Sequence, residues 1–96
     1  MLNGKQKRFL RALANKEKSL FQVGKDGLSY NFFNQINDYL EVHELVKISL
    51  LKTCDIDVRE AALDLSANTS SEVVQIIGRV IILYRPSKER IIKLPC

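Results

Sequence analysis

The 96-residue sequence predicts an α/β domain of order α-β-α-β-α-β-β, with helices layered on a four-stranded mixed sheet. Segments whose apolar residues recur with the helical period alternate with segments whose apolar residues recur at every second position. Helices between strands require crossover connections, which pair strands in parallel, whereas a tight turn at Gly78 makes the last two strands an antiparallel hairpin. A hydrophobic fraction of 46% supports one globular domain over residues 1–96.

The first predicted helix covers residues 4–15 and is amphipathic. Its apolar side chains fall within about 100° of arc and mark the buried face: Leu2, Phe9, Leu10 and Leu13. The remaining surface of this helix carries four cations: Lys5, Lys7, Arg8 and Arg11. A short strand is expected over residues 19–23, after which Ser29 can cap a second helix that ends near Val42. Its inward face is expected to hold four large apolar residues: Phe32, Phe33, Ile36 and Leu40.

The middle of the chain predicts a second strand and a third helix. Apolar and polar residues alternate along "ELVKISLL", which indicates a strand over residues 44–51 with one partly polar face. Asp57 and Glu60 have the spacing of a capping box, with Asp as the cap. They therefore predict a helix that begins after Asp57 and ends near Asn68.

Two β-rich runs, residues 72–78 and 79–85, meet at Gly78–Arg79 as a hairpin. "ERIIKL", residues 89–94, is expected to add a short edge strand. Tyr84 shares a face of its strand with apolar residues two and four positions earlier, so core packing is favoured over stacking on a nucleobase.

The net charge of +4 hides an uneven distribution along the chain. Residues 1–25 have a balance of +6, residues 26–77 a balance of −6 and residues 78–96 a balance of +4. If the basic ends meet in space, they form one positive face, which is typical of a protein that binds a polyanion. Solvated charge with no partner is the alternative. Clustering after and beside the last strand favours phosphate contact for Arg79, Arg85, Lys88 and Arg90.

Two of the four glycines flank a Lys-Asp pair at Gly24, Lys25, Asp26 and Gly27. This loop follows a strand and precedes a helix, so unpaired backbone N–H groups and the helix N-terminus attract anions there. Glycines let the backbone approach a phosphate, and Lys25 adds a mobile charge. The spacing fits neither Walker A nor the dinucleotide fingerprint, which leaves the GXXG mode of clamping a nucleic-acid backbone, with a plain turn as the alternative. Asp26 is expected to face away or to cap the helix.

The sequence resembles the CRM domain in its free-standing bacterial form, the small YhbY-like RNA-binding proteins. The resemblance covers essentially the whole chain through "LNGKQKRFLRALA", "VGKDGLS", "HELVKISLL" and "IGRVIILYRPSKERIIKLP". It implies an α-β-α-β-α-β-β fold similar to the C-terminal domain of bacterial translation initiation factor three. It also implies RNA binding through the GxxG loop and nearby basic surface. Bacterial members are associated with maturation of the large ribosomal subunit, and plant relatives act in group II intron splicing.

Carried over to this sequence, the resemblance implies three groups of RNA-binding residues. The loop group is Gly24, Lys25, Asp26 and Gly27, with Asp26 at the variable position. The N-terminal group is Lys5, Lys7, Arg8 and Arg11. The terminal group is Arg79, Tyr84, Arg85 and Lys88.

We therefore expect a cytoplasmic, monomeric and non-enzymatic RNA-binding protein with no cofactor, no membrane and no small-molecule substrate. Cations from both chain ends, Arg90 included, are expected to converge beside the glycine loop and to neutralise phosphates. Phosphate contacts carry little sequence information, so selectivity is expected to come from RNA shape, as in the structured ribosomal RNA of pre-large-subunit particles. The acidic middle keeps a second possibility open: a module that docks on a ribosomal protein or assembly factor.

Other chemistries find little support in the sequence. Cys54 and Cys96 fit reduced thiols, since they are too few for a disulfide scaffold. His43, the single histidine, has no partners for a metal site or a catalytic triad. A metal cluster is disfavoured because a helix start better explains Asp57 and Glu60 among four nearby carboxylates: Asp55, Asp57, Glu60 and Asp64. The longest apolar tract is too short to span a bilayer, and the N-terminus has no secretory signal.

Overall fold

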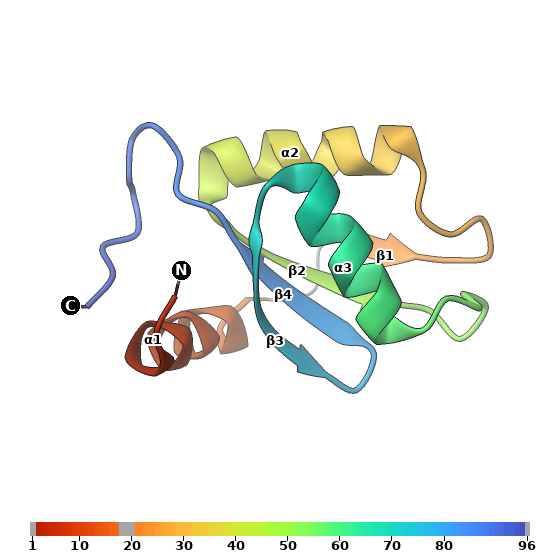
Figure 1. Cartoon of the computed structure of the whole chain (residues 1–96), viewed down its shortest axis with the longest axis horizontal. Coiled ribbons are helices and arrows are strands. Elements are labelled where there is room, and N and C mark those ends of the chain that lie inside the picture. Colours follow the sequence, from red (N-terminus) through yellow and green to blue (C-terminus); the bar gives the residue numbers. More distant parts are fainter. Residues whose placement is uncertain (1, 18–20, 96) are drawn as a thin grey trace.

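The computed structural model describes residues 2–17 and 21–95. Figure 1 shows helices packed on both faces of one sheet. The elements in chain order are α1 (Gly4–Asn15), β1 (Phe21–Val23), α2 (Tyr30–His43), β2 (Leu45–Leu50), α3 (Val58–Thr69), β3 (Glu72–Ile77) and β4 (Val80–Tyr84). The predicted order and the four-stranded mixed sheet are confirmed. No helix among the described residues is long and apolar enough to cross a membrane.

The strands lie in the order β1-β2-β4-β3, with β1 parallel to β2 and β4 antiparallel to both of its neighbours. The loops after β1 and β2 and the turn between β3 and β4 consequently lie at one end of the sheet. We call this the loop end; it carries residues 24–29, 51–57 and 78–79. Residues 85–95 leave β4 from the opposite end, which we call the tail end (Figure 1).

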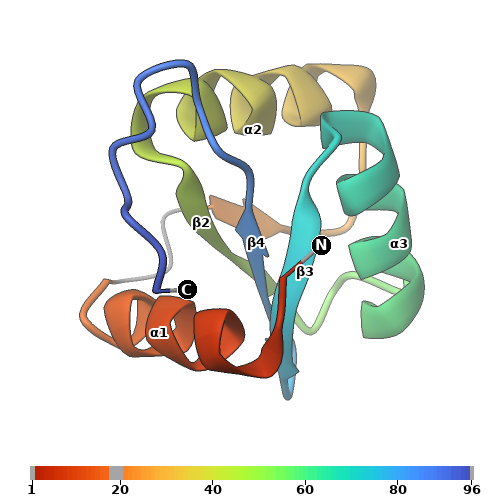
Figure 2. The same ribbon diagram turned by 60° about the vertical axis from the view of Figure 1, so that its left-hand side comes forward.

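Alternating side chains divide the core between the two faces of the sheet. On the face covered by α2 and α3, Ile81 and Leu83 of β4 pack with Ile36 and Leu65. On the other face, α1 packs over β4 and its neighbours (Figure 2). The buried residues of that second cluster are Leu10, Ala14, Leu45, Val74, Ile82 and Tyr84. Core packing of Tyr84, favoured over base stacking by the sequence, is therefore confirmed.

Each helix begins at a polar cap that satisfies its first backbone N–H groups. The Ser29 hydroxyl accepts from Phe32 N, and the Asp57 carboxylate accepts from the backbone N–H groups of the first turn of α3. The caps predicted at both positions are confirmed. A reciprocal Asn3–Gln6 capping box at α1 was not anticipated from the sequence.

Two sequence-based details are wrong. Residues 89–94 form no strand, because Ile92 N donates to a carboxylate instead of to a neighbouring strand and Arg90 has a positive φ of 48°. Phe9 is 38% exposed, since the sheet covers the arc of α1 centred on Leu10 and Ala14. Part of the strand predicted over 19–23 lies outside the described residues, as does Cys96; residues 21–23 are extended.

A buried carboxylate, Glu44, holds the C-terminal segment on the tail end of the sheet. Glu44 has no exposed surface and occupies the left-handed C-cap of α2, with φ 67°. Its carboxylate accepts from Ser87 N at 2.6 Å, Ser87 Oγ at 2.8 Å and Ile92 N at 2.6 Å. Its backbone oxygen accepts from Arg85 N. These bonds fix both the start and the middle of residues 85–95.

Glu44→Gln is expected to lower the free energy of unfolding by about 2 kcal/mol at pH 7, the scale of hydrogen bonds to a charged group. Burial raises the pKa of Glu44, but hydrogen bonds from Ile92, Ser87 and Ile91 prevail, and the pKa lies below its ordinary value. The charged form therefore stabilises the fold above the ordinary carboxyl range, and this stabilisation is lost as pH falls through the lowered pKa. Urea unfolding from pH 7 to pH 3 measures both effects.

Glu89→Gln is the matched control, because Glu89 is exposed in the same segment. It should leave both the midpoint and the pH dependence of unfolding unchanged. Equal effects of the two variants would contradict the role assigned to the Glu44 carboxylate.

Candidate nucleic-acid interface

The Gly24–Gly27 loop is a tight turn between β1 and α2. Gly27 N donates to Gly24 O at 3.0 Å and closes the turn. Lys25 and Asp26 occupy its tip and are both exposed. Asp26 does not cap α2, because Ser29 does so. The loop thus presents a lysine and a helix N-terminus to solvent at the loop end of the sheet, which is an arrangement that favours anions.

The structural requirement for glycine differs between positions 24 and 27. Gly27 has a φ of 69°, a conformation that other residues adopt only at a cost, and a Cβ there would lie 3.2 Å from Ile56 Cδ1. Gly24 has no positive φ, and a Cβ would meet Leu51 Cδ1 at an ordinary 3.5 Å. The fold therefore requires glycine at position 27, whereas neither packing nor backbone conformation requires it at position 24.

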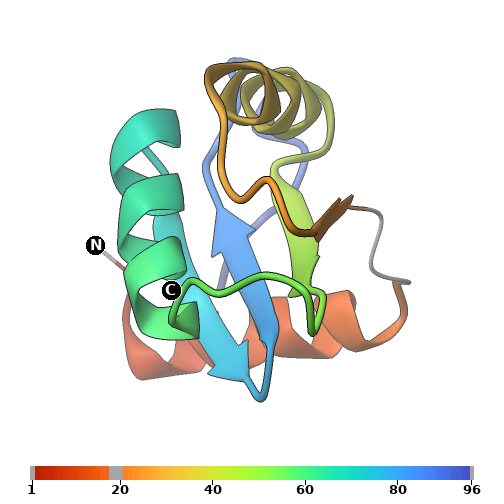
Figure 3. The same ribbon diagram turned by 90° about the vertical axis from the view of Figure 1, so that its right-hand side faces the viewer.

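The 51–57 loop lies beside this turn at the loop end of the sheet (Figure 3). Leu51 N donates to Val23 O at 2.8 Å, which joins the start of the 51–57 loop to the end of β1. Lys52 is exposed in this loop. Sequence reasoning did not select Lys52, because it lies far from the glycines in the chain. Parallel pairing of β1 with β2 brings it to the same end of the sheet.

Arg79 in the β3–β4 turn holds the 51–54 loop in place. Its Nε donates to Leu50 O at 3.0 Å, and Nη2 donates to Leu51 O at 2.8 Å and to Cys54 O at 3.0 Å. A guanidinium has five N–H donors, so the two on Nη1 remain for another acceptor. Arg79 is thus both a positioning residue and a fixed positive charge at the loop end.

Cations of α1 reach the same region from the other face of the sheet. Arg8 and Arg11 line a shallow groove with Gln75 and Ile77, at the end of β3 that leads into the turn. The same helix also carries Lys5, which is exposed, and Lys7, which is half-buried. The structure therefore brings part of the N-terminal group toward the β3–β4 turn.

The C-terminal cations do not join this group. Lys88 and Arg90 follow β4, which runs antiparallel to β2, so they lie at the tail end. The chain ends do meet there, since Gln6 Nε2 donates to Pro95 O at 3.1 Å. The predicted convergence of both cationic ends beside the glycine loop is wrong, because strand direction separates the C-terminal cations from it.

Arg85 is turned into the protein. Its Nη1 donates to Asn37 Oδ1 and Thr69 O, and its Nη2 donates to Asn37 O and Glu41 Oε1, at 2.6–3.0 Å. Both terminal nitrogens are fully used, and the side chain is 16% exposed. Its position ties α2 to the end of α3 and leaves only Nε for any further partner.

The residues weighed for other chemistry lie apart from one another. His43 is exposed and stacks on Tyr39, with ring centroids 4.2 Å apart. Cys54 is a buried free thiol. Within the part of the chain that the structure describes, no group of His, Cys, Asp and Glu side chains has the arrangement of a metal site.

Both the sequence and the fold of this chain are similar to those of known proteins. The CRS1 / YhbY (CRM) domain matches residues 2–85. "Probable RNA-binding protein YqeI" of Bacillus subtilis is 47% identical over 96 residues, which cover 99% of this chain and 100% of the relative. An "RNA-binding protein" of Haemophilus influenzae is 36% identical over 97 residues, covering 98% and 95%. The solution structure of the hypothetical protein SAV1595 from Staphylococcus aureus is similar with a TM-score of 0.82 and 49% identity, covering 99% and 100%.

Alanine substitutions at Gly24 and Gly27 are expected to lower the free energy of unfolding to different extents. Gly27→Ala should lower the free energy of unfolding by about 1 kcal/mol, because alanine is strained at this positive φ. Gly24→Ala should change it by less than about 0.5 kcal/mol. Urea unfolding of both variants measures the difference. A Gly24→Ala loss as large as that of Gly27→Ala would show that the fold also needs glycine at position 24.

Proposed function

This chain belongs to the CRS1/YhbY (CRM) domain family, and we propose that it binds RNA, chiefly through phosphate contacts at the loop end of the sheet. The observation that carries the proposal is the gathering of exposed cations around a turn that precedes a helix N-terminus. Lys25 and Lys52 come from two adjacent loops, and Arg79 keeps two N–H donors beside them. Arg8 and Arg11 extend the positive surface along α1.

We assign different roles to the cations that the sequence selected. Lys25 is the proposed phosphate contact in the loop, where Gly24 and Gly27 shape the backbone. Lys5 and Lys7 supply charge from α1. Arg79 positions the neighbouring loop and keeps donors for RNA. Arg85 holds α2 to α3, and its effect on RNA binding would be indirect.

Few large aromatic rings are available for stacking on bases. Among the described residues, Tyr30 is 69% exposed and Phe9 38%, and no other aromatic side chain ranks with the exposed large hydrophobics. Phosphate contacts position an RNA without reading its sequence. We therefore propose that the protein selects RNA by shape, and that its target is structured ribosomal RNA during assembly of the large ribosomal subunit.

Crosslinking in cells, followed by sequencing of the attached RNA, tests this target. Enrichment of large-subunit ribosomal RNA over other abundant RNAs is expected. Enrichment confined to another RNA class would overturn the ribosomal assignment and leave RNA binding itself intact.

Lys25→Glu is expected to weaken RNA binding by about tenfold to a hundredfold, since it replaces a phosphate contact of charge-assisted strength by repulsion. For the wild type, the logarithm of affinity should fall linearly with the logarithm of salt concentration, by about 0.7–0.9 per neutralised phosphate. Lys25→Gln should reduce this slope by about 1. Fluorescence anisotropy with a structured ribosomal RNA fragment at several salt concentrations measures both quantities.

Lys88→Glu makes the same charge change at the tail end and should weaken binding less than Lys25→Glu does. If the two variants weaken binding equally, net charge alone explains the effect and the loop has no special part. Docking on a basic protein through the acidic middle segment is the competing function. It predicts partner binding that survives Lys25→Glu and shows no RNA dependence.

A further inference from the structure

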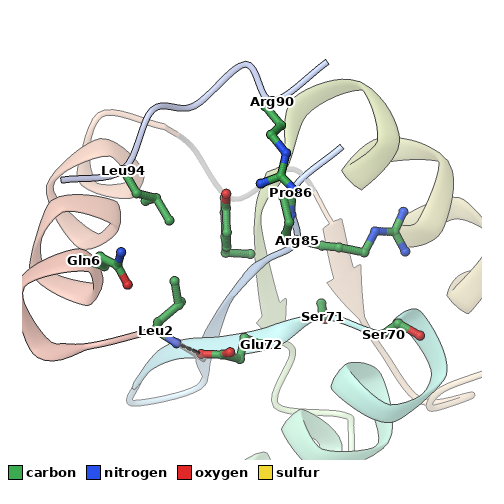
Figure 4. Close-up of a pocket in the computed structure, with 10 residues that line it drawn as sticks. Leu2, Gln6, Ser70, Ser71, Glu72, Arg85, Pro86, Arg90 and Leu94 are labelled. Carbon is green, nitrogen blue, oxygen red and sulfur yellow. Dashed lines mark hydrogen bonds between the residues drawn. The ribbon is translucent and has the colours of Figure 1, made fainter. Parts of the chain in front are cut away.

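A pocket of about 330 Å³, drawn in Figure 4, lies at the tail end of the sheet. The glycine loop lies at the opposite end of the sheet. Residues near both ends of the described chain line it: Leu2 and Gln6 from the N-terminal part, and Arg90 and Leu94 from the C-terminal part. Glu72 at the start of β3 and Tyr84 at the end of β4 also line the pocket. This volume is at the low end of the range for small-ligand sites, roughly 300–1,000 Å³.

Arg90 is held in an unusual backbone conformation that directs it toward this pocket. Its φ is 48°, and its backbone N–H donates to Ser87 O at 3.2 Å, which closes a turn in the segment fixed by Glu44. Figure 4 shows the Arg90 side chain extending into the pocket, whereas Arg85 extends away toward α2. The Arg90 guanidinium has no hydrogen bond or ion pair with any described residue, so its five donors are available.

Tyr84 brings a second donor to the same pocket. The residue is only 6% exposed, and its ring packs in the core beneath α1. Its hydroxyl has no hydrogen-bond partner among the described residues, yet no polar atom there is both fully buried and unsatisfied. The hydroxyl therefore opens onto the pocket. Burial, followed by the Glu44 charge, raises the pKa of Tyr84, while Arg90 lowers it; the net direction is upward, and the hydroxyl stays a donor at neutral pH.

The charged surroundings favour an anion that also carries hydrogen-bond donors. An adjoining pocket shares Gln6, Tyr84 and Arg90 and adds Lys93 as a second cation. Glu72 is the acidic group in the first pocket, where its carboxylate accepts from Leu2 N at 2.8 Å. A nucleotide can place its phosphate at the cations and its ribose hydroxyls toward acceptors.

We propose that this pocket binds one ribonucleotide, with its phosphate on the Arg90 guanidinium and the Tyr84 hydroxyl. The inference deepens the proposed RNA-binding function and rests on it for the source of the nucleotide, which is a strand of the bound RNA or a free mononucleotide. With the loop end as the first contact, an RNA would touch opposite ends of a molecule whose longest extent is 39 Å. Two such contacts would fix the orientation of an RNA that one positive surface alone could not fix.

The test is an NMR titration of the full chain with adenosine 5′-monophosphate, followed through the Arg90 Nε–Hε resonance and the backbone amides of residues 84–94. Saturable shifts confined to the pocket are expected. Arg90→Gln should weaken binding at least tenfold, and Tyr84→Phe, which keeps the packed ring, should weaken it severalfold. Lys88→Gln is the matched control: it removes the same charge from an exposed position in the same segment that lines neither pocket, and should change affinity less than twofold.

Equal losses for Arg90→Gln and Lys88→Gln, or no saturable binding, would overturn the proposal. Arg90→Lys should restore part of the affinity if the charge acts on the phosphate. Unchanged amide shifts around Glu44 and Ser87 in the Arg90 variants exclude collapse of the segment as the cause.

Competition identifies the source of the nucleotide. A 5′-phosphorylated RNA hexamer that displaces the mononucleotide indicates a strand of RNA, whereas failure to displace it indicates a free nucleotide. Lys25→Glu should leave mononucleotide binding unchanged, because Lys25 lies at the other end of the sheet. RNA binding and mononucleotide binding are therefore measured separately. If the chain binds RNA but no mononucleotide, this inference fails and the RNA-binding proposal stands. If it binds the mononucleotide but no RNA, the RNA-binding proposal fails and the pocket remains a nucleotide site.

Discussion

The buried carboxylate of Glu44 is the interaction on which the arrangement of the tail end depends. It stands where α2 passes into β2, in a left-handed conformation that turns the chain directly into the sheet. From there it receives the backbone of the segment after β4 through Ser87 and Ile92. A buried charge is costly unless it is fully hydrogen-bonded, and here the bonds come from a segment that has no regular structure of its own. The same contact therefore satisfies the charge and orders the C-terminal residues.

The distinctive "LYRPS" stretch, residues 83–87, has a structural role as well. Tyr84 packs beneath α1, Arg85 joins α2 to the end of α3, and Ser87 binds the Glu44 carboxylate. Three of its five residues thus hold together elements that lie far apart in the sequence. The sequence of this stretch suggests a basic surface, but in the fold its side chains mainly hold separate elements together.

The sequence was sufficient to predict the element order, the caps at Ser29 and Asp57, and the inward face of Tyr84, because periodicity and capping are local properties. The prediction that the cations of both chain ends converge was wrong, because it grouped charges by their position in the chain and not by the end of the sheet at which they lie. Crossovers make β1 and β2 run the same way, and the final hairpin reverses β4, so the tail cations had to leave the sheet opposite to the glycine loop. The partners of Arg79, Arg85 and Glu44 could not be predicted, since each depends on contacts between segments separated by 16 to 48 residues.

Formal charge alone is a poor guide to which cations can meet a phosphate; the count of unused donors is a better one. Lys47 Nζ donates to Ala14 O in α1 and to Glu17 O just after that helix, and Arg85 uses both terminal nitrogens in internal bonds. Each would have to break internal bonds before it could bind a phosphate. A hydrogen bond to a charged group contributes about 1.5–3 kcal/mol, so breaking one offsets most of the gain from one new charge-assisted contact. Lys25 and Arg90 have no such side-chain bonds within the described chain, and they stand at opposite ends of the sheet. Donor availability, combined with strand direction, therefore divides the positive charge of this fold into two separate surfaces.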